Sequence, residues 1–159
     1  MHVGRLDLFR RLPGFTFVVT QDVISEIVQP DQKQEVEHAL ASGKLQPEDL
    51  SDPAMLTLFA ELRHLMGAGE AASLALAFHK GWAIASDEKR AFRREALARL
   101  GQSRILTTPG LYLVAIRSGL LSVEEADTDR SRLEARKFRM DFSSFRDLLS
   151  RGSGNPRKK

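Results

Sequence analysis

Short apolar runs alternate with longer stretches of helical periodicity along the chain. Runs rich in β-branched and aromatic residues predict strands at 15–19, 82–86 and 104–108. Apolar residues spaced three and four apart predict helices at 5–12, 21–28, 32–43, 53–66, 70–80, 88–100, 109–119, 122–138 and 143–151. This order predicts an α/β fold with three layers, α/β/α, around a mainly parallel central sheet.

Local signals refine several of these elements. Ser122 and Glu125 have the spacing of a capping box, which predicts the start of a helix. Pro30 is expected to end one helix, and Asp31 is expected to cap the next one. The run 82–86 lacks polar alternation, so we expect a strand that is covered on both faces.

Length and composition indicate one domain over residues 1–150. The chain has 159 residues, of which 42% are hydrophobic, so it can bury a sizeable core. It has no cysteine, which excludes disulfides, thiolate nucleophiles and cysteine-ligated zinc and suits a reducing compartment. No apolar run approaches the roughly 20 residues that span a bilayer. We therefore expect a cytoplasmic protein without a membrane partner.

The net charge of +3 depends on the end of the chain. Residues 151–159 hold four of the 24 basic residues and none of the 21 acidic ones, so the rest carries 20 basic against 21 acidic residues. We expect 151–159 to be a disordered basic tail. Because the remainder is close to neutral, nucleic-acid binding would need a local cluster of basic residues.

Three acidic residues fall where sites form in α/β folds. Asp87 directly follows the predicted strand 82–86, Glu70 opens the helix that leads to this strand, and Glu26 follows the strand 15–19. Ligands bind beyond the carboxyl ends of parallel strands. Carboxylates that meet there repel one another unless a cation intervenes, and Mg²⁺ takes a few carboxylates plus waters. Such a site can support hydrolysis of a phosphodiester.

Each acid also has a simpler structural interpretation. Glu70 is favourable in the first turn of a helix because of the helix dipole. Asp87 can cap the predicted helix 88–100, and Glu26 can be a solvated helix residue. Spacing alone therefore does not establish a site.

Four ordered motifs extend the interpretation. They are "VVTQDVISEI" (18–27), "GAGEAASLALAFHKG" (67–81), "IASDEKRAFRREALARLG" (84–101) and "ILTTPGLYLVAIRSGLL" (105–121). With these motifs the chain resembles a PIN domain over about residues 5–150. This is the fold of many metal-dependent ribonucleases, including VapC-type toxins.

The resemblance implies roles for matching residues. Glu26, Glu70 and Asp87 would bind one or two Mg²⁺ or Mn²⁺ ions, and Thr108 would support the site. The substrate would be RNA, a small antitoxin protein would be a partner, and homodimers would form. The alternative is a non-catalytic PIN-like module that binds nucleic acid or protein.

The start of the chain departs from the family pattern. PIN domains begin with a strand that ends in a metal-ligating aspartate, whereas "MHVGRLDLFRRLPG" resembles the segment after this strand, and Asp7 does not match. Two explanations stay open: the true start lies upstream, or the chain has lost its first strand. The second would weaken the metal site, expose a sheet edge and favour the non-catalytic alternative.

A cluster of basic residues follows Asp87. Its members are Lys89, Arg90, Arg93 and Arg94. Beside a phosphate-cleaving site they would hold the RNA backbone without reading its bases. The alternative is a solvated helix face with Glu88 and Glu95 as ion-pair partners.

Overall fold

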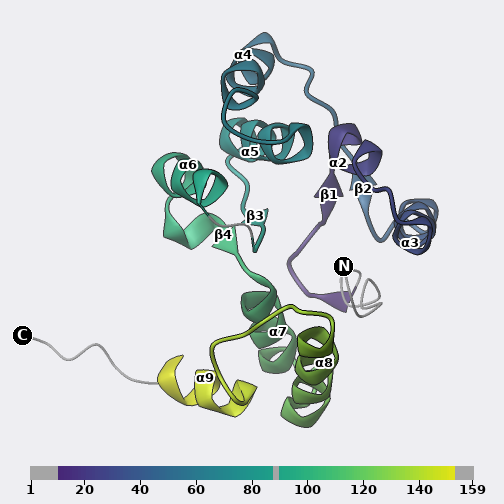
Figure 1. Ribbon diagram of the computed structural model, residues 1–159, viewed down its shortest axis with the longest axis vertical. Coiled ribbons are helices and arrows are strands. Elements are labelled where there is room, and N and C mark those ends of the chain that lie inside the picture. Colours follow the sequence, from purple (N-terminus) through teal and green to yellow (C-terminus); the bar gives the residue numbers. More distant parts are fainter. Residues whose placement is uncertain (1–10, 88–89, 153–159) are drawn as a thin grey trace, which may run out of the picture.

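The computed structural model describes residues 11–87 and 90–152 (Figure 1). The strands are β1 (Val18–Val19), β2 (Gln46–Pro47), β3 (Ile84–Ala85) and β4 (Ile105–Leu106). The helices are α2 (Gln21–Ser25), α3 (Pro30–Ala41), α4 (Pro53–Leu62), α5 (Ala68–Lys80), α6 (Ala91–Leu100), α7 (Thr108–Arg117), α8 (Val123–Ala135) and α9 (Phe145–Gly152), with a 3₁₀ turn at Gln102–Arg104. Helices thus alternate with short strands, which confirms the α/β class.

The described strands form two parallel pairs. β1 pairs with β2, with Val18 opposite Gln46, and β3 pairs with β4, with Ile84 opposite Ile105. Parallel pairing is as predicted, but the two pairs are separate two-stranded sheets and each strand has only two residues. β2 was not expected because Gln-Pro carries no β-branched or aromatic signal.

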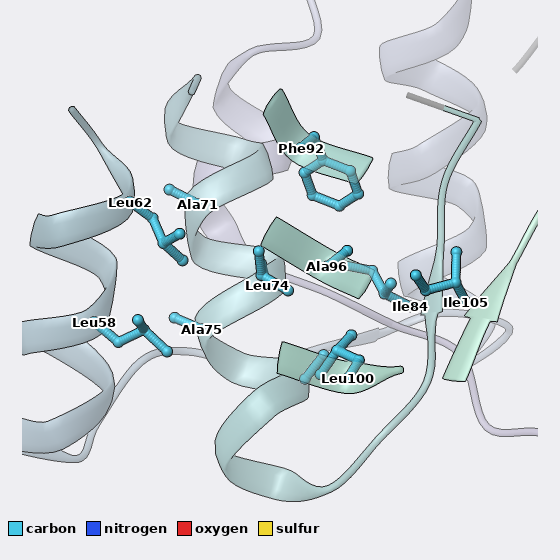
Figure 2. Close-up of a cluster of buried hydrophobic side chains, with 11 residues drawn as sticks. Leu58, Leu62, Ala71, Leu74, Ala75, Ile84, Phe92, Ala96, Leu100 and Ile105 are labelled. Carbon is cyan, nitrogen blue, oxygen red and sulfur yellow. The ribbon is translucent and has the colours of Figure 1, made fainter. Parts of the chain in front are cut away.

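Helix α5 lies at the centre of the larger hydrophobic core. It is buried on several sides, as its alanine-rich sequence predicts. α4, α6, β3 and β4 pack around it, and Figure 2 shows their apolar side chains meeting between the elements. The buried members are Leu58, Leu62, Ala71, Leu74, Ala75, Ala77, Ile84, Phe92, Ala96, Leu100 and Ile105. This core fixes α5 relative to the end of β3.

A second core holds the C-terminal helices together. Figure 1 shows α7, α8 and α9 grouped at one end of the molecule and α4 and α5 at the other. Phe145 of α9 is fully buried and stacks on Tyr112 of α7, with ring centroids 5.2 Å apart. A third, smaller core joins α3 to the β1–β2 pair through Val36, Ala39 and Leu45.

Capping explains most of the observed helix starts. The predicted capping box of α8 is present: Ser122 N donates to Glu125 Oε2 at 2.8 Å, and Glu125 N donates to Ser122 Oγ at 3.1 Å. The expected boundary at Pro30 is wrong, because Pro30 is the first residue of α3 and does not end the preceding helix. Proline is well tolerated at this position because its missing N–H would have no helical acceptor there.

The strand β3 is covered less than its sequence predicts. Ile84 is buried, but Trp82, Ala83 and Ala85 are exposed. The expectation of a strand covered on both faces is therefore wrong. The reason is that the helices of the larger core cover only the side of β3 toward which Ile84 points.

Some sequence predictions fall outside the described chain. Most of the predicted helix 5–12 and the residues 153–159 of the predicted tail lie there. The start of that tail is helical, because α9 extends to Gly152. In the part of the chain that is described, every helix is too short or too polar to span a bilayer.

Candidate functional site

Glu26 reaches from one helix to the start of another. It is the C-terminal capping residue of α2, a short helix that Thr20 opens by accepting a hydrogen bond from Val23 N. Glu26 Oε1 accepts a hydrogen bond from Gly69 N at 2.9 Å, across 43 residues of sequence. Gly69 N is one of the first amides of α5, which have no acceptor within their own helix. Glu26 supplies that acceptor.

Glu70 caps the same helix from within. It lies in the first turn of α5, and its Oε2 accepts a hydrogen bond from Gly67 N at 3.1 Å. A Cβ placed on Gly67 would lie 3.4 Å from Glu26 Oε1 and 3.7 Å from Glu70 Oε2. The two carboxylates therefore converge on one spot at the N-terminus of α5.

The surroundings of this pair offset its charge repulsion. Partial positive charge at a helix N-terminus favours nearby carboxylates, and each acid also accepts a backbone N–H. Within 11–87 and 90–152, the second oxygens, Glu26 Oε2 and Glu70 Oε1, accept no hydrogen bond. These two carboxylate oxygens are the kind of ligand atom that a hard divalent cation prefers.

Asp87 lies two residues beyond β3 and contacts Thr108. Its Oδ1 accepts from Thr108 N at 2.9 Å, and its Oδ2 accepts from Thr108 Oγ1 at 2.5 Å. Thr108 is the first residue of α7, so Asp87 caps α7. The simpler interpretation, that Asp87 caps the helix after it, does not hold because α6 begins only at Ala91.

The structure thus divides the predicted site residues into two pairs. It brings Glu26 to Glu70, and it brings Asp87 to Thr108. In the part of the chain that is described, no three histidine, aspartate or glutamate side chains group closely enough to hold a metal ion. Asp87 is therefore not gathered with the other two acids.

The predicted basic cluster is only partly available for a nucleic acid. Lys89 lies outside the described residues. Arg90 and Arg94 are exposed and Arg93 is half-buried. Arg94 Nε lies 3.2 Å from Glu95 Oε1, while Arg90 and Arg93 form no ion pair with another described residue. Arg94 thus has one of the acidic partners that the solvated-face alternative expected.

The sequence analysis did not single out Gly67 and Gly69, whose N–H groups donate to Glu70 and Glu26. Gly69 is buried, and a Cβ placed there would lie 2.6 Å from Glu26 Oε2 and 3.0 Å from Val23 Cγ2. The available signal was the pair of glycines in "GAGE", immediately before and inside a helix. Glycine is unfavourable in helices, so its presence indicates close approach of another group.

Comparison of the sequence with known protein families identifies the family of this chain. A family model described as a PIN domain matches residues 1–153, so the chain belongs to the PIN domain family. This confirms the resemblance found in the motifs, whereas the idea of a missing first strand stays a prediction. Neither the curated proteins nor the solved structures gave a match. The family suggests a nuclease-like or nucleic-acid-binding module, and PIN domains generally use divalent metal ions.

Proposed function

We propose that this chain is a PIN-type ribonuclease that hydrolyses RNA phosphodiesters with Mg²⁺ or Mn²⁺. The observation that carries the proposal is the convergence of Glu26 and Glu70 at the N-terminus of α5. Two acids that are far apart in sequence approach each other, and each keeps one oxygen without a hydrogen-bond partner in the described structure. Capping of α5 uses only one oxygen of each acid, so the second oxygens stay available to a cation.

The donor set fits a divalent cation of the hard type. Mg²⁺ is commonly held by one or two carboxylates and completes its shell with waters and substrate phosphates. Glu26 and Glu70 would hold the ion. When bound, such an ion lowers the pKa of water and stabilises the negative charge that develops on the phosphate.

In this proposal Asp87 and Thr108 support the metal site, and the basic residues bind the substrate. Asp87, fixed by Thr108, contributes a further carboxylate at the end of β3. Arg90 and Arg93 attract the phosphate backbone, because cations bind RNA mainly through its phosphates. Lys89 and Arg94 are the other members of the proposed nucleic-acid surface.

A second function, a non-catalytic PIN-like module that binds nucleic acid or protein, is favoured by two observations. Both oxygens of Asp87 are engaged by Thr108, and the described residues contain no group of three potential ligands. A site with fewer acids holds a metal less tightly. Such a chain would bind RNA without cleaving it.

Cleavage of single-stranded RNA in Mn²⁺ decides between the two functions. We expect Glu70→Gln and Asp87→Asn each to lower the cleavage rate at least about a hundredfold, the upper end of the effect of losing an outer-shell partner. Both substitutions keep shape and one hydrogen-bond acceptor, so circular dichroism should stay that of the unaltered chain. Rates should also fall to background with EDTA.

Glu37→Gln is the matched control. Glu37 is exposed on α3 and makes no hydrogen bond or ion pair in the described structure, so this variant should cleave normally. Unchanged cleavage by Glu70→Gln and Asp87→Asn would reject the assigned residues. RNA binding without any metal-dependent cleavage by the unaltered chain would support the binding module instead.

Toxin activity, inhibition by a small antitoxin, homodimer formation and a cytoplasmic location stay predictions. The first three rest on family resemblance alone, and the last rests on the composition of the chain.

A further inference from the structure

Gly69 is the residue around which the carboxylate pair is built. It is buried in the first turn of α5, where α2 crosses close to the helix. A Cβ on Gly69 would lie 3.2 Å from Val23 Cα and 3.0 Å from Val23 Cγ2, so the two helices approach as closely as a glycine allows. No left-handed backbone angle requires glycine at this position. The requirement is for space.

The group most affected by an added Cβ is the carboxylate of Glu26. Its Oε2 would lie 2.6 Å from that Cβ, which is far inside van der Waals contact. This oxygen is the end of a flexible side chain, whereas Val23 Cα is backbone. The carboxylate would therefore move furthest, while α2 at Val23 would also have to give by a few tenths of an ångström.

We propose that Gly69 is a positioning residue that sets the place of the Glu26 carboxylate for cation binding. Its N–H holds Oε1, and its missing Cβ leaves room for Oε2 at the N-terminus of α5. This inference rests on the proposed function, since it concerns the same pair of acids. It explains why a helix that buries so many alanines has glycine here, although alanine is the better helix former.

The substitution Gly69→Ala tests the role of the missing Cβ separately from the role of the N–H hydrogen bond. Alanine keeps the N–H donor and adds only the Cβ. We expect Mn²⁺ alone, titrated by isothermal calorimetry, to bind about tenfold to a hundredfold more weakly, as when the groups that orient a metal ligand are removed. The thermal midpoint should fall modestly, because Val23 must also shift, and circular dichroism should stay close to that of the unaltered chain.

Gly110→Ala is the matched control. Gly110 also lies in the first turn of a helix, α7, but among the described residues a Cβ there meets only Thr107 Oγ1, at an ordinary 3.5 Å. This variant should bind Mn²⁺ normally. Normal Mn²⁺ binding by Gly69→Ala as well would overturn the inference and leave the proposed function standing.

Combination with Glu26→Gln separates positioning from general packing. If Gly69 acts through Glu26, then Gly69→Ala adds little to the loss caused by Glu26→Gln. Additive losses would show that Gly69 acts independently and would contradict the inference. If Gly69→Ala does not fold, the same comparison is made with Val23→Ala included, which removes Val23 Cγ2 and leaves the carboxylate contact.

A metal-free measurement distinguishes failure of this inference from failure of the proposed function. The amide resonance of residue 69 is followed by NMR. Glu26→Gln should shift this resonance when Gly69 is present, and should shift it much less when Gly69→Ala is also present. An unaltered chain that binds no Mn²⁺ but shows this difference would reject the metal site while preserving the positioning of Glu26. An equal shift in both backgrounds would reject the positioning.

Discussion

At the scale of single residues, the predicted acids all act as helix caps. Glu26 and Glu70 accept amides of α5, and Asp87 accepts the amide and hydroxyl of Thr108 at the start of α7. The sequence indicated each acid and the place of Glu70 in the first turn of a helix, but it assigned Asp87 to the helix that follows it and treated Glu26 as a solvated residue. It could not indicate which helix each one caps, because two of these hydrogen-bonded pairs join residues 21 and 43 positions apart.

Thr108→Val tests the hydrogen bond to Asp87. The change removes the hydroxyl donor but keeps the backbone donor, so the free energy of unfolding should fall by about 1–2 kcal/mol. Urea denaturation measures this decrease. Thr108→Ser keeps the hydroxyl and should recover most of it. Equal stability of Thr108→Val and the unaltered chain would show that the hydroxyl contributes nothing.

At the scale of secondary-structure elements, local signals succeeded where they act within one helix. The capping box of α8 and the alanine-rich face of α5 needed no tertiary information. β2 and the open face of β3 could not be predicted, because both depend on what packs beside the strand. The strand lengths were overestimated for the same reason: an apolar run shows neither which of its residues pair with a neighbouring strand nor, at 82–86, that all of them are buried.

The junction of α8 and α9 provides a test at this scale. Asp127 of α8 accepts Ser144 Oγ at 2.6 Å and Phe145 N at 2.8 Å, and so caps α9 next to a fully buried ring. Asp127→Ala should lower the free energy of unfolding by about 1–2 kcal/mol, the range for losing such a cap. Thermal denaturation measures it. Asp141→Ala, at an exposed residue between the two helices, is the control and should change little. An unaffected Asp127→Ala variant would contradict the capping role.

At the scale of the whole molecule, charge is close to balanced outside the last residues, so RNA binding depends on where the basic residues gather. The sequence predicted one such cluster beside Asp87. Glu95 partly neutralises it, because this residue pairs with both Arg94 and Arg99. The sequence predicted Glu95 as an ion-pair partner of this cluster, but only the structure shows that it pairs with Arg94.

Arg93→Ala combined with Arg94→Ala tests this surface. RNA affinity should fall, and the slope of log affinity against log salt should become shallower by about 1 to 2, one unit for each phosphate that the variant no longer neutralises. Fluorescence anisotropy at several salt concentrations measures both quantities. Arg117→Ala with Arg146→Ala removes the same charge from exposed positions on α7 and α9 and should leave the slope unchanged. An identical slope in the first variant would show that the cluster does not bind RNA.

The contact between Asp87 and Thr108 also connects two parts of the molecule that have separate cores. Ile84, three residues before Asp87, belongs to the core around α5, whereas α7, which Thr108 begins, belongs to the core of the C-terminal helices. Loosening of the C-terminal third would therefore release this carboxylate while α4, α5 and α6 were still folded. The surroundings of the Asp87 carboxylate would therefore report on whether α7–α9 are docked.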